Sequence, residues 1–105
     1  MITSGEGKTK VWLEKKQVGE DLVLILGGGE KTHIGAVIMC TLDGKTQILK
    51  YGTHKDYIVL EPIAKIACEK YKTNVVATGG VHIENASKKE IEEVIDNCKR
   101  LEECI

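Results

Sequence analysis

Two continuous apolar runs constrain the fold of this chain more than any other feature of its sequence. Leu22–Leu26 and Ile34–Leu42 are too short to cross a membrane and lack the polar alternation of a half-exposed strand. Each run therefore predicts a strand that is buried on both faces. A chain of 105 residues has room for one domain with one core. The rest of the sequence must accordingly supply cover for both faces of a sheet.

Three further strands are predicted, over Lys8–Val18, Thr46–Tyr51 and Asn74–Thr78. The first alternates between apolar and polar residues, and the second follows Asp43-Gly44, a strong two-residue hairpin signal. Residues 1–7 are polar and contain glycine, so we expect a disordered N-terminus. Residues 8–105 are then predicted to form a single α+β domain.

Two helices are predicted after the fourth strand. The first covers Tyr57–Lys72 with Asp56 as a candidate N-cap, and Pro62 predicts either a later start near Glu61 or a kink. The second opens at Ser87-Lys88-Lys89-Glu90, which matches a capping box. Apolar residues form one stripe of this second helix, at Ile91, Val94, Ile95, Cys98 and Leu101.

The predicted order is ββββαβα, with two helices on one face of a largely antiparallel, five-stranded sheet. Short connections favour an antiparallel meander for the first four strands, and the crossover makes the fifth strand parallel to the fourth if the two are neighbours. Two helices cover only one face of such a sheet. We therefore expect the chain to form a homodimer through the opposite face.

Charge and cysteine content narrow the function classes. The net charge is −1 with charges of both signs interspersed, so neither nucleic acid nor a membrane surface is an expected partner. The first ten residues contain no apolar export signal, which predicts a soluble, cytoplasmic protein. The four cysteines form no CxxC pair, and we expect them to be reduced and buried.

All three histidines fall in loops that the predicted strand order brings to one end of the sheet. Glycine-rich backbone, imidazoles, a lysine and the start of each helix would make a pocket for an anion or a phosphate there. The candidate ligand-binding residues are Gly27, Gly28, Gly29, His33, His54, Lys55, Asp56, His82, Glu84 and Asn85.

Other roles for these residues stay open. His54 or Asp56 could cap the first helix, and Asn85 or Ser87 the second. A metal site would use His33, His54 and His82, with Asp56 or Glu84 completing the ligand shell. Acid–base catalysis by the same side chains is a further alternative, although no nucleophile is evident, because Ser4 lies in the N-terminal segment and Ser87 is assigned as a cap.

Three segments, LGGGEKTHIGAV, YGTHKD and TGGVHIENASKKEIEEV, resemble a family of small prenylated-flavin chaperone-like proteins typified by the D component of gallate decarboxylase. The residues on the family's motif positions are His33, Gly35, His54, Lys55, Asp56, His82 and Asn85. Thr32 stands where the family has proline, and Glu84 where it has aspartate. The resemblance covers about three-quarters of the chain.

The resemblance implies a non-catalytic accessory protein that assists the maturation of, or delivers cofactor to, a UbiD-type decarboxylase dependent on prenylated flavin mononucleotide (prenylated FMN). That cofactor, or another phosphate-bearing ligand, would suit the predicted anion pocket. The order of elements is also similar to that of proteasome assembly chaperones 3 and 4, which favours a protein-binding module as the alternative. A small histidine-dependent or metal-dependent enzyme is the third possibility.

Overall fold

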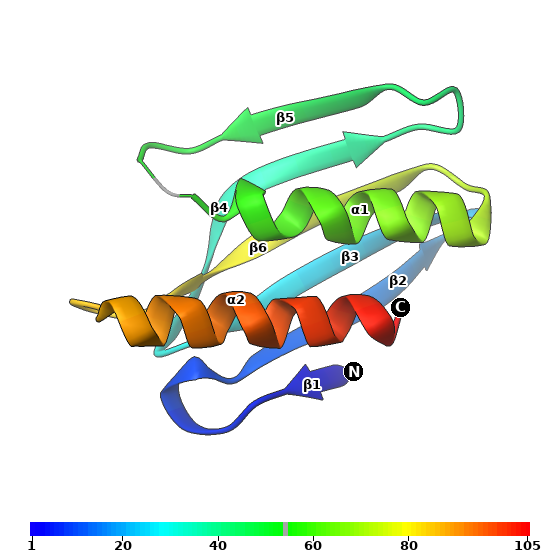
Figure 1. Cartoon of the computed structure of the whole chain (residues 1–105). Helices are drawn as coiled ribbons and strands as arrows, with labels where there is room; N and C mark the ends of the chain where they lie inside the picture. Colours follow the sequence, from blue (N-terminus) through cyan, green and yellow to red (C-terminus); the bar gives the residue numbers. More distant parts are fainter. Residues whose placement is uncertain (54) are drawn as a thin grey trace.

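The computed structural model describes residues 1–53 and 55–105, and in these ranges it has six strands and two α-helices. In chain order the elements are β1 (Ile2–Ser4), the 3-10 helix η1 (Gly7–Thr9), β2 (Val11–Val18), β3 (Asp21–Gly28), β4 (Lys31–Cys40), β5 (Thr46–Lys50), α1 (Tyr57–Tyr71), β6 (Val75–His82) and α2 (Lys88–Glu103). The strands form one mixed sheet, and α1 and α2 pack together on one face of it (Figure 1). The predicted α+β class is confirmed.

The order of the strands corrects the predicted meander. The sheet runs β1-β2-β3-β6-β4-β5, so β6 separates β3 from β4 and pairs parallel to the former and antiparallel to the latter. Val75 and Ala77 of β6 are fully buried, which suits an interior strand. Gly79 permits the close approach to β3, since a Cβ atom there would lie 2.0 Å from the carbonyl oxygen of Leu26.

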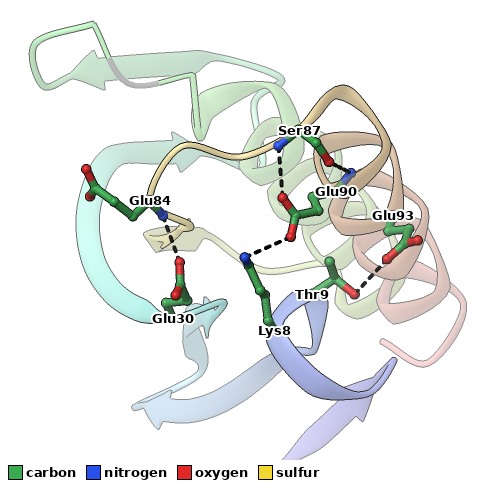
Figure 2. Close-up of polar contacts among 7 residues, drawn as sticks. All are labelled: Lys8, Thr9, Glu30, Glu84, Ser87, Glu90 and Glu93. Carbon is green, nitrogen blue, oxygen red and sulfur yellow. Dashed lines mark hydrogen bonds and ion pairs between the residues drawn. The ribbon is translucent and has the colours of Figure 1, made fainter.

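The sixth strand lies in the segment for which disorder was expected. β1 pairs antiparallel with β2 at the edge of the sheet, and Ile2 packs against the core. The following 3-10 helix η1 is attached to α2, because the side-chain amide of Asn97 donates to the Thr9 carbonyl at 2.9 Å. Lys8 also pairs with Glu90 at 3.0 Å (Figure 2). These contacts with residues distant in sequence order a segment for which composition alone predicts disorder.

The hydrophobic core lies between the helices and the sheet. Its largest fully buried side chains include Leu13, Leu24, Leu26, Ile38, Leu60, Ile63 and Leu101. The alternate residues of the central strands face the other way and are half-buried, among them Val23, Ile25, Val37, Met39 and Val76. No helix among the described residues covers this opposite face (Figure 1). We call it the open face.

Both helices begin where the sequence places them. α1 starts at Tyr57 and continues through Pro62 to Tyr71, so a start near Glu61 was wrong. The capping box of α2 is confirmed, because the Ser87 hydroxyl accepts from the Glu90 amide at 3.1 Å and the Glu90 carboxylate accepts from the Ser87 amide at 2.9 Å. Within the described ranges, neither helix has the length and apolar character needed to span a membrane.

All four cysteines of the chain are free, but they are not all buried as expected. Cys40 and Cys98 are buried, Cys68 is half-buried and Cys104 is exposed just beyond the end of α2. Burial raises the pKa of the Cys98 thiol to about 12, with Glu102 and Asp56 adding to the shift. Cys98 is therefore a protonated core residue rather than a reactive thiol.

Candidate functional site

The end of the sheet at which β3 and β6 finish and β4 begins carries the candidate site. Because β6 is parallel to β3 and antiparallel to β4, these strand ends coincide. The register of β4 against β6 shifts between Thr32 and Ala36, so the intervening segment bulges. His33 lies in this bulge, which directs its side chain toward the start of α1.

Asp56 connects three elements at this end. Its Oδ1 accepts a hydrogen bond from the Val81 amide of β6 at 3.0 Å, and its Oδ2 lies 3.1 Å from His33 Nε2. The side chains of Asp56 and His33 are only 10% and 20% exposed. Asp56 occupies the N-cap position of α1, but its side chain makes no capping hydrogen bond. The capping role considered for this carboxylate is thus replaced by long-range pairing with β4 and β6.

Two glycines make room for the buried carboxylate. A Cβ atom at Gly35 would lie 1.9 Å from Asp56 Oδ2, and one at Gly80 would lie 2.7 Å from Asp56 Cγ and 2.9 Å from His33 Cδ2. Gly35 was predicted as a site residue, and the structure places it against Asp56. Gly80 was not among the candidates, although its position in the Gly79-Gly80 pair at a strand end was a usable signal.

His82 lies beside this buried pair, nearer the surface. Its ring centroid is 5.8 Å from that of His33, with the two planes inclined at 61°. Its Nε2 lies 3.2 Å from Glu84 Oε2, and the two side chains are 41% and 76% exposed. The predicted proximity of His33 and His82 is observed, whereas His54 lies outside the described residues.

The connection between β3 and β4 is hydrogen-bonded to the end of β6 and to the loop that follows it. The Glu30 amide donates to the His82 carbonyl at 2.9 Å. The Glu84 amide donates to Glu30 Oε1 at 2.8 Å (Figure 2). Gly29 abuts the same carbonyl, since a Cβ atom there would lie 2.6 Å from it. The loop after β6 is thereby tied to the β3–β4 turn.

The structure does not bring every candidate glycine to the histidines. A Cβ atom at Gly27 would meet the Trp12 ring at 2.1 Å, and one at Gly28 would meet the Lys10 carbonyl at 2.3 Å. Packing against neighbouring β2 explains glycine at both positions. Asn85 adopts a left-handed backbone conformation with φ of 50° in the turn that leads to α2.

A groove of about 300 Å³ opens beside the site, between the first halves of α1 and α2. Lys55, Asp56 and His82 form its polar end. The remainder is apolar and includes Ile58, Val59, Val81, Ile91, Val94 and Ile95. Ile58 and Ile91 are 49% and 50% exposed. The apolar stripe of α2 therefore extends beyond the core and lines a surface groove, which sequence periodicity alone did not distinguish from core packing.

The electrostatics of the site differ from those of a simple anion pocket. Each described imidazole lies beside a carboxylate, His33 beside Asp56 and His82 beside Glu84. An anion that binds His82 Nε2 competes with Glu84, whose exposed pairing is weak and exchangeable. Residues 1–53 and 55–105 contain no grouping of three or more His, Cys, Asp or Glu side chains that could hold a metal ion.

The fold and the site define a small α+β domain with a ligand-sized groove, polar at one end and free of serine, threonine and cysteine among its described lining residues. Residues 5–105 match the family described as the prenylated flavin chaperone LpdD-like domain, and the chain belongs to this family.

The chain is also similar to Protein LpdD of Lactiplantibacillus plantarum, with 28% identity over 79 residues. This match covers 70% of the chain and 58% of the relative, so the chain spans a little over half of that protein's length.

Proposed function

We propose that this protein is a non-catalytic accessory protein that binds prenylated FMN and assists the maturation of a UbiD-type decarboxylase. The observation that carries the proposal is the family match over residues 5–105, which includes every element of the site. The likeness to proteasome assembly chaperones stays a prediction.

The chemistry of the groove supports binding rather than turnover. Among the described residues that line it, only Lys55, Asp56 and His82 are ionisable, and Asp56 is held by the Val81 amide and His33. Ser87 is occupied in the capping box of α2. A hydrolase or transferase needs a nucleophile or metal facing an acid–base group, and the described lining offers acid–base groups without an evident partner.

In this proposal the phosphate of the ligand binds at the polar end of the groove. Lys55 supplies a positive charge, and His82 supplies a donor once Glu84 turns away. Asp56 lines the same end of the groove and is held by His33 and the Val81 amide, while Gly35 and Gly80 leave room for its carboxylate.

Reconstitution of a UbiD-type decarboxylase tests the proposed function. Apo-decarboxylase is incubated anaerobically with reduced prenylated FMN, with or without this protein, and the rate at which activity appears is measured. We expect the protein to accelerate activation and to show no decarboxylase activity alone. Lys55→Ala should weaken FMN and prenylated FMN binding at least about tenfold, because a hydrogen bond to a charged group contributes about 1.5–3 kcal/mol.

Lys45→Ala is the matched control for that variant. Lys45 is an exposed lysine in the turn between β4 and β5, at the other end of the sheet, so its removal should leave binding unchanged. Activation that proceeds equally fast without the protein, or wild-type protein that binds neither flavin, would refute the proposed function.

We also propose that the protein forms a homodimer through the open face and acts in the cytoplasm. The support for self-association is the apolar character of that face, where Val37 lies between Thr78 and the 71% exposed Leu49. The support for a reducing compartment is that all four cysteines of the chain are free.

A further inference from the structure

The groove between α1 and α2 is larger and more apolar than a phosphate site requires. A phosphate needs only the end formed by Lys55 and His82, whereas most of the described lining is aliphatic. Ile58 and Ile91 each leave about half of their surface in water. Covering them with an apolar ligand group is favourable in proportion to the apolar area removed from water.

The division of the groove into two parts matches the division of a prenylated flavin. One part of that molecule is an anionic phosphate, and the other is a fused ring system to which prenylation adds an apolar, non-aromatic ring. The groove has its one described cationic side chain, Lys55, at one end and aliphatic side chains along the rest. Its volume of about 300 Å³ is at the lower limit of ligand pockets.

We propose that this apolar part holds the ring added by prenylation, and that Ile58, Ala86 and Ile91 thereby make the protein select prenylated FMN over FMN. The inference rests on the proposed function and extends it to specificity. Aliphatic side chains suit this ring because it lacks the polar atoms of the flavin and offers only apolar surface. Ordinary FMN places no such ring in the groove, so it leaves Ile58 and Ile91 partly in water.

The test compares the affinities of the intact protein for two probes, FMN and reduced prenylated FMN, by anaerobic fluorescence titration. We expect wild-type protein to prefer the prenylated form at least tenfold, because the added carbons become buried. Ile91→Gln places a polar group of similar length on the groove wall without breaking the helix. Ala86→Leu partly fills the groove. Both variants should lower the affinity for prenylated FMN about tenfold and weaken FMN binding much less, because only the prenylated form carries the added ring.

Ile48→Gln is the matched control. Ile48 lies in β5, away from the groove, and is 38% exposed, so the same substitution there should preserve the preference. Circular dichroism establishes that each variant is folded before its affinity is measured.

The outcomes separate this inference from the proposed function. Wild-type protein that binds both flavins equally, or groove variants that weaken both to the same extent, would overturn the inference and leave the proposed function standing. Variants that keep both flavin affinities but fail to activate the decarboxylase would assign the groove to the client protein instead, and would also overturn it. Binding of neither flavin by the wild type would refute both proposals.

Discussion

At the residue scale, Asp56 organises the site through contacts that are remote in sequence. One carboxylate oxygen accepts from Val81 and the other lies against His33, while Gly35 and Gly80 leave space for the side chain. A buried carboxylate is tolerated only when such partners are present. Residues from the separate histidine and glycine motifs therefore pack against one another within the protein itself.

Gly80→Ala should destabilise the protein by about 1–3 kcal/mol, because its Cβ atom would overlap the Asp56 carboxylate and the His33 ring. Urea denaturation measures the cost. In a double-mutant cycle, the cost should fall when Asp56→Ala has already removed the obstacle. Equal costs in the two backgrounds would show that the crowding around Asp56 is not the cause.

Glu84→Gln should strengthen the binding of inorganic phosphate and FMN. The substitution removes the negative charge that lies 3.2 Å from His82 Nε2 and competes with an incoming anion. Because the pair is exposed, we expect a gain of about two- to fivefold, corresponding to less than about 1 kcal/mol. Isothermal titration measures the affinity. Weaker binding in the variant would indicate that Glu84 contacts the ligand directly.

At the element scale, α2 is stabilised by local capping and by the N-terminal segment. Its capping box is a sequence signal that folds as predicted, and Lys8 adds an ion pair to the same glutamate. Thr9 donates to Glu93 one turn further along the helix (Figure 2). The segment before β2 and the helix that closes the chain thus hold each other in place.

Glu90 should give the start of α2 an acid-sensitive stability. The hydrogen bond from the Ser87 amide and the nearby Lys8 ammonium lower the pKa of Glu90 below its ordinary value of 4.5. A lowered pKa stabilises the folded state above pH 4.5, and this contribution is lost as the pH falls through the folded-state value. The melting temperature of Glu90→Gln should therefore lie below that of the wild type at pH 7, with the difference shrinking in acid.

Glu92→Gln is the control for this measurement, since it removes the same charge from the same helix two residues away. A pH dependence that is identical for wild type, Glu90→Gln and Glu92→Gln would contradict the assigned role of Glu90.

At the scale of the whole molecule, the helices cover one face of the sheet and leave the other open (Figure 1). The edge strand β5 is exposed along its whole length, and the central strands present half-buried Val, Ile and Met side chains. The apolar runs in β3 and β4 are the reason we expect a homodimer through the open face, and this dimer stays a prediction.

Val37→Asp should convert the proposed dimer into monomers, because it would bury an unpaired charge at the centre of the interface. Sedimentation velocity at micromolar concentration measures the oligomeric state. Ile58→Asp makes the same kind of change on the helical side and should leave association intact. A wild-type monomer under these conditions would exclude the proposed dimer.

The sequence determined the elements of this protein, because their signals are local. Apolar runs, a hairpin dipeptide and a capping box each act within a few residues, and β2 to β6 and both helices lie close to where those signals place them. His33 and His82 do lie at one end of the sheet, although the strand order from which we predicted this was wrong. Family motifs named Gly35 and Asp56 as site residues without indicating that the two touch.

Only the tertiary structure decided the strand order and the role of Asp56. A strand that is apolar on both faces does not reveal its neighbours, so nothing local indicated that β6 would enter between β3 and β4. Once β6 lies there, the Val81 amide reaches Asp56, and a residue with the local features of a helix cap becomes a buried link between elements. The ordering of β1 likewise depends on contacts with β2 and α2, which composition cannot encode. In each case the structure depends on contacts between residues far apart in the sequence, and local sequence signals do not specify such contacts.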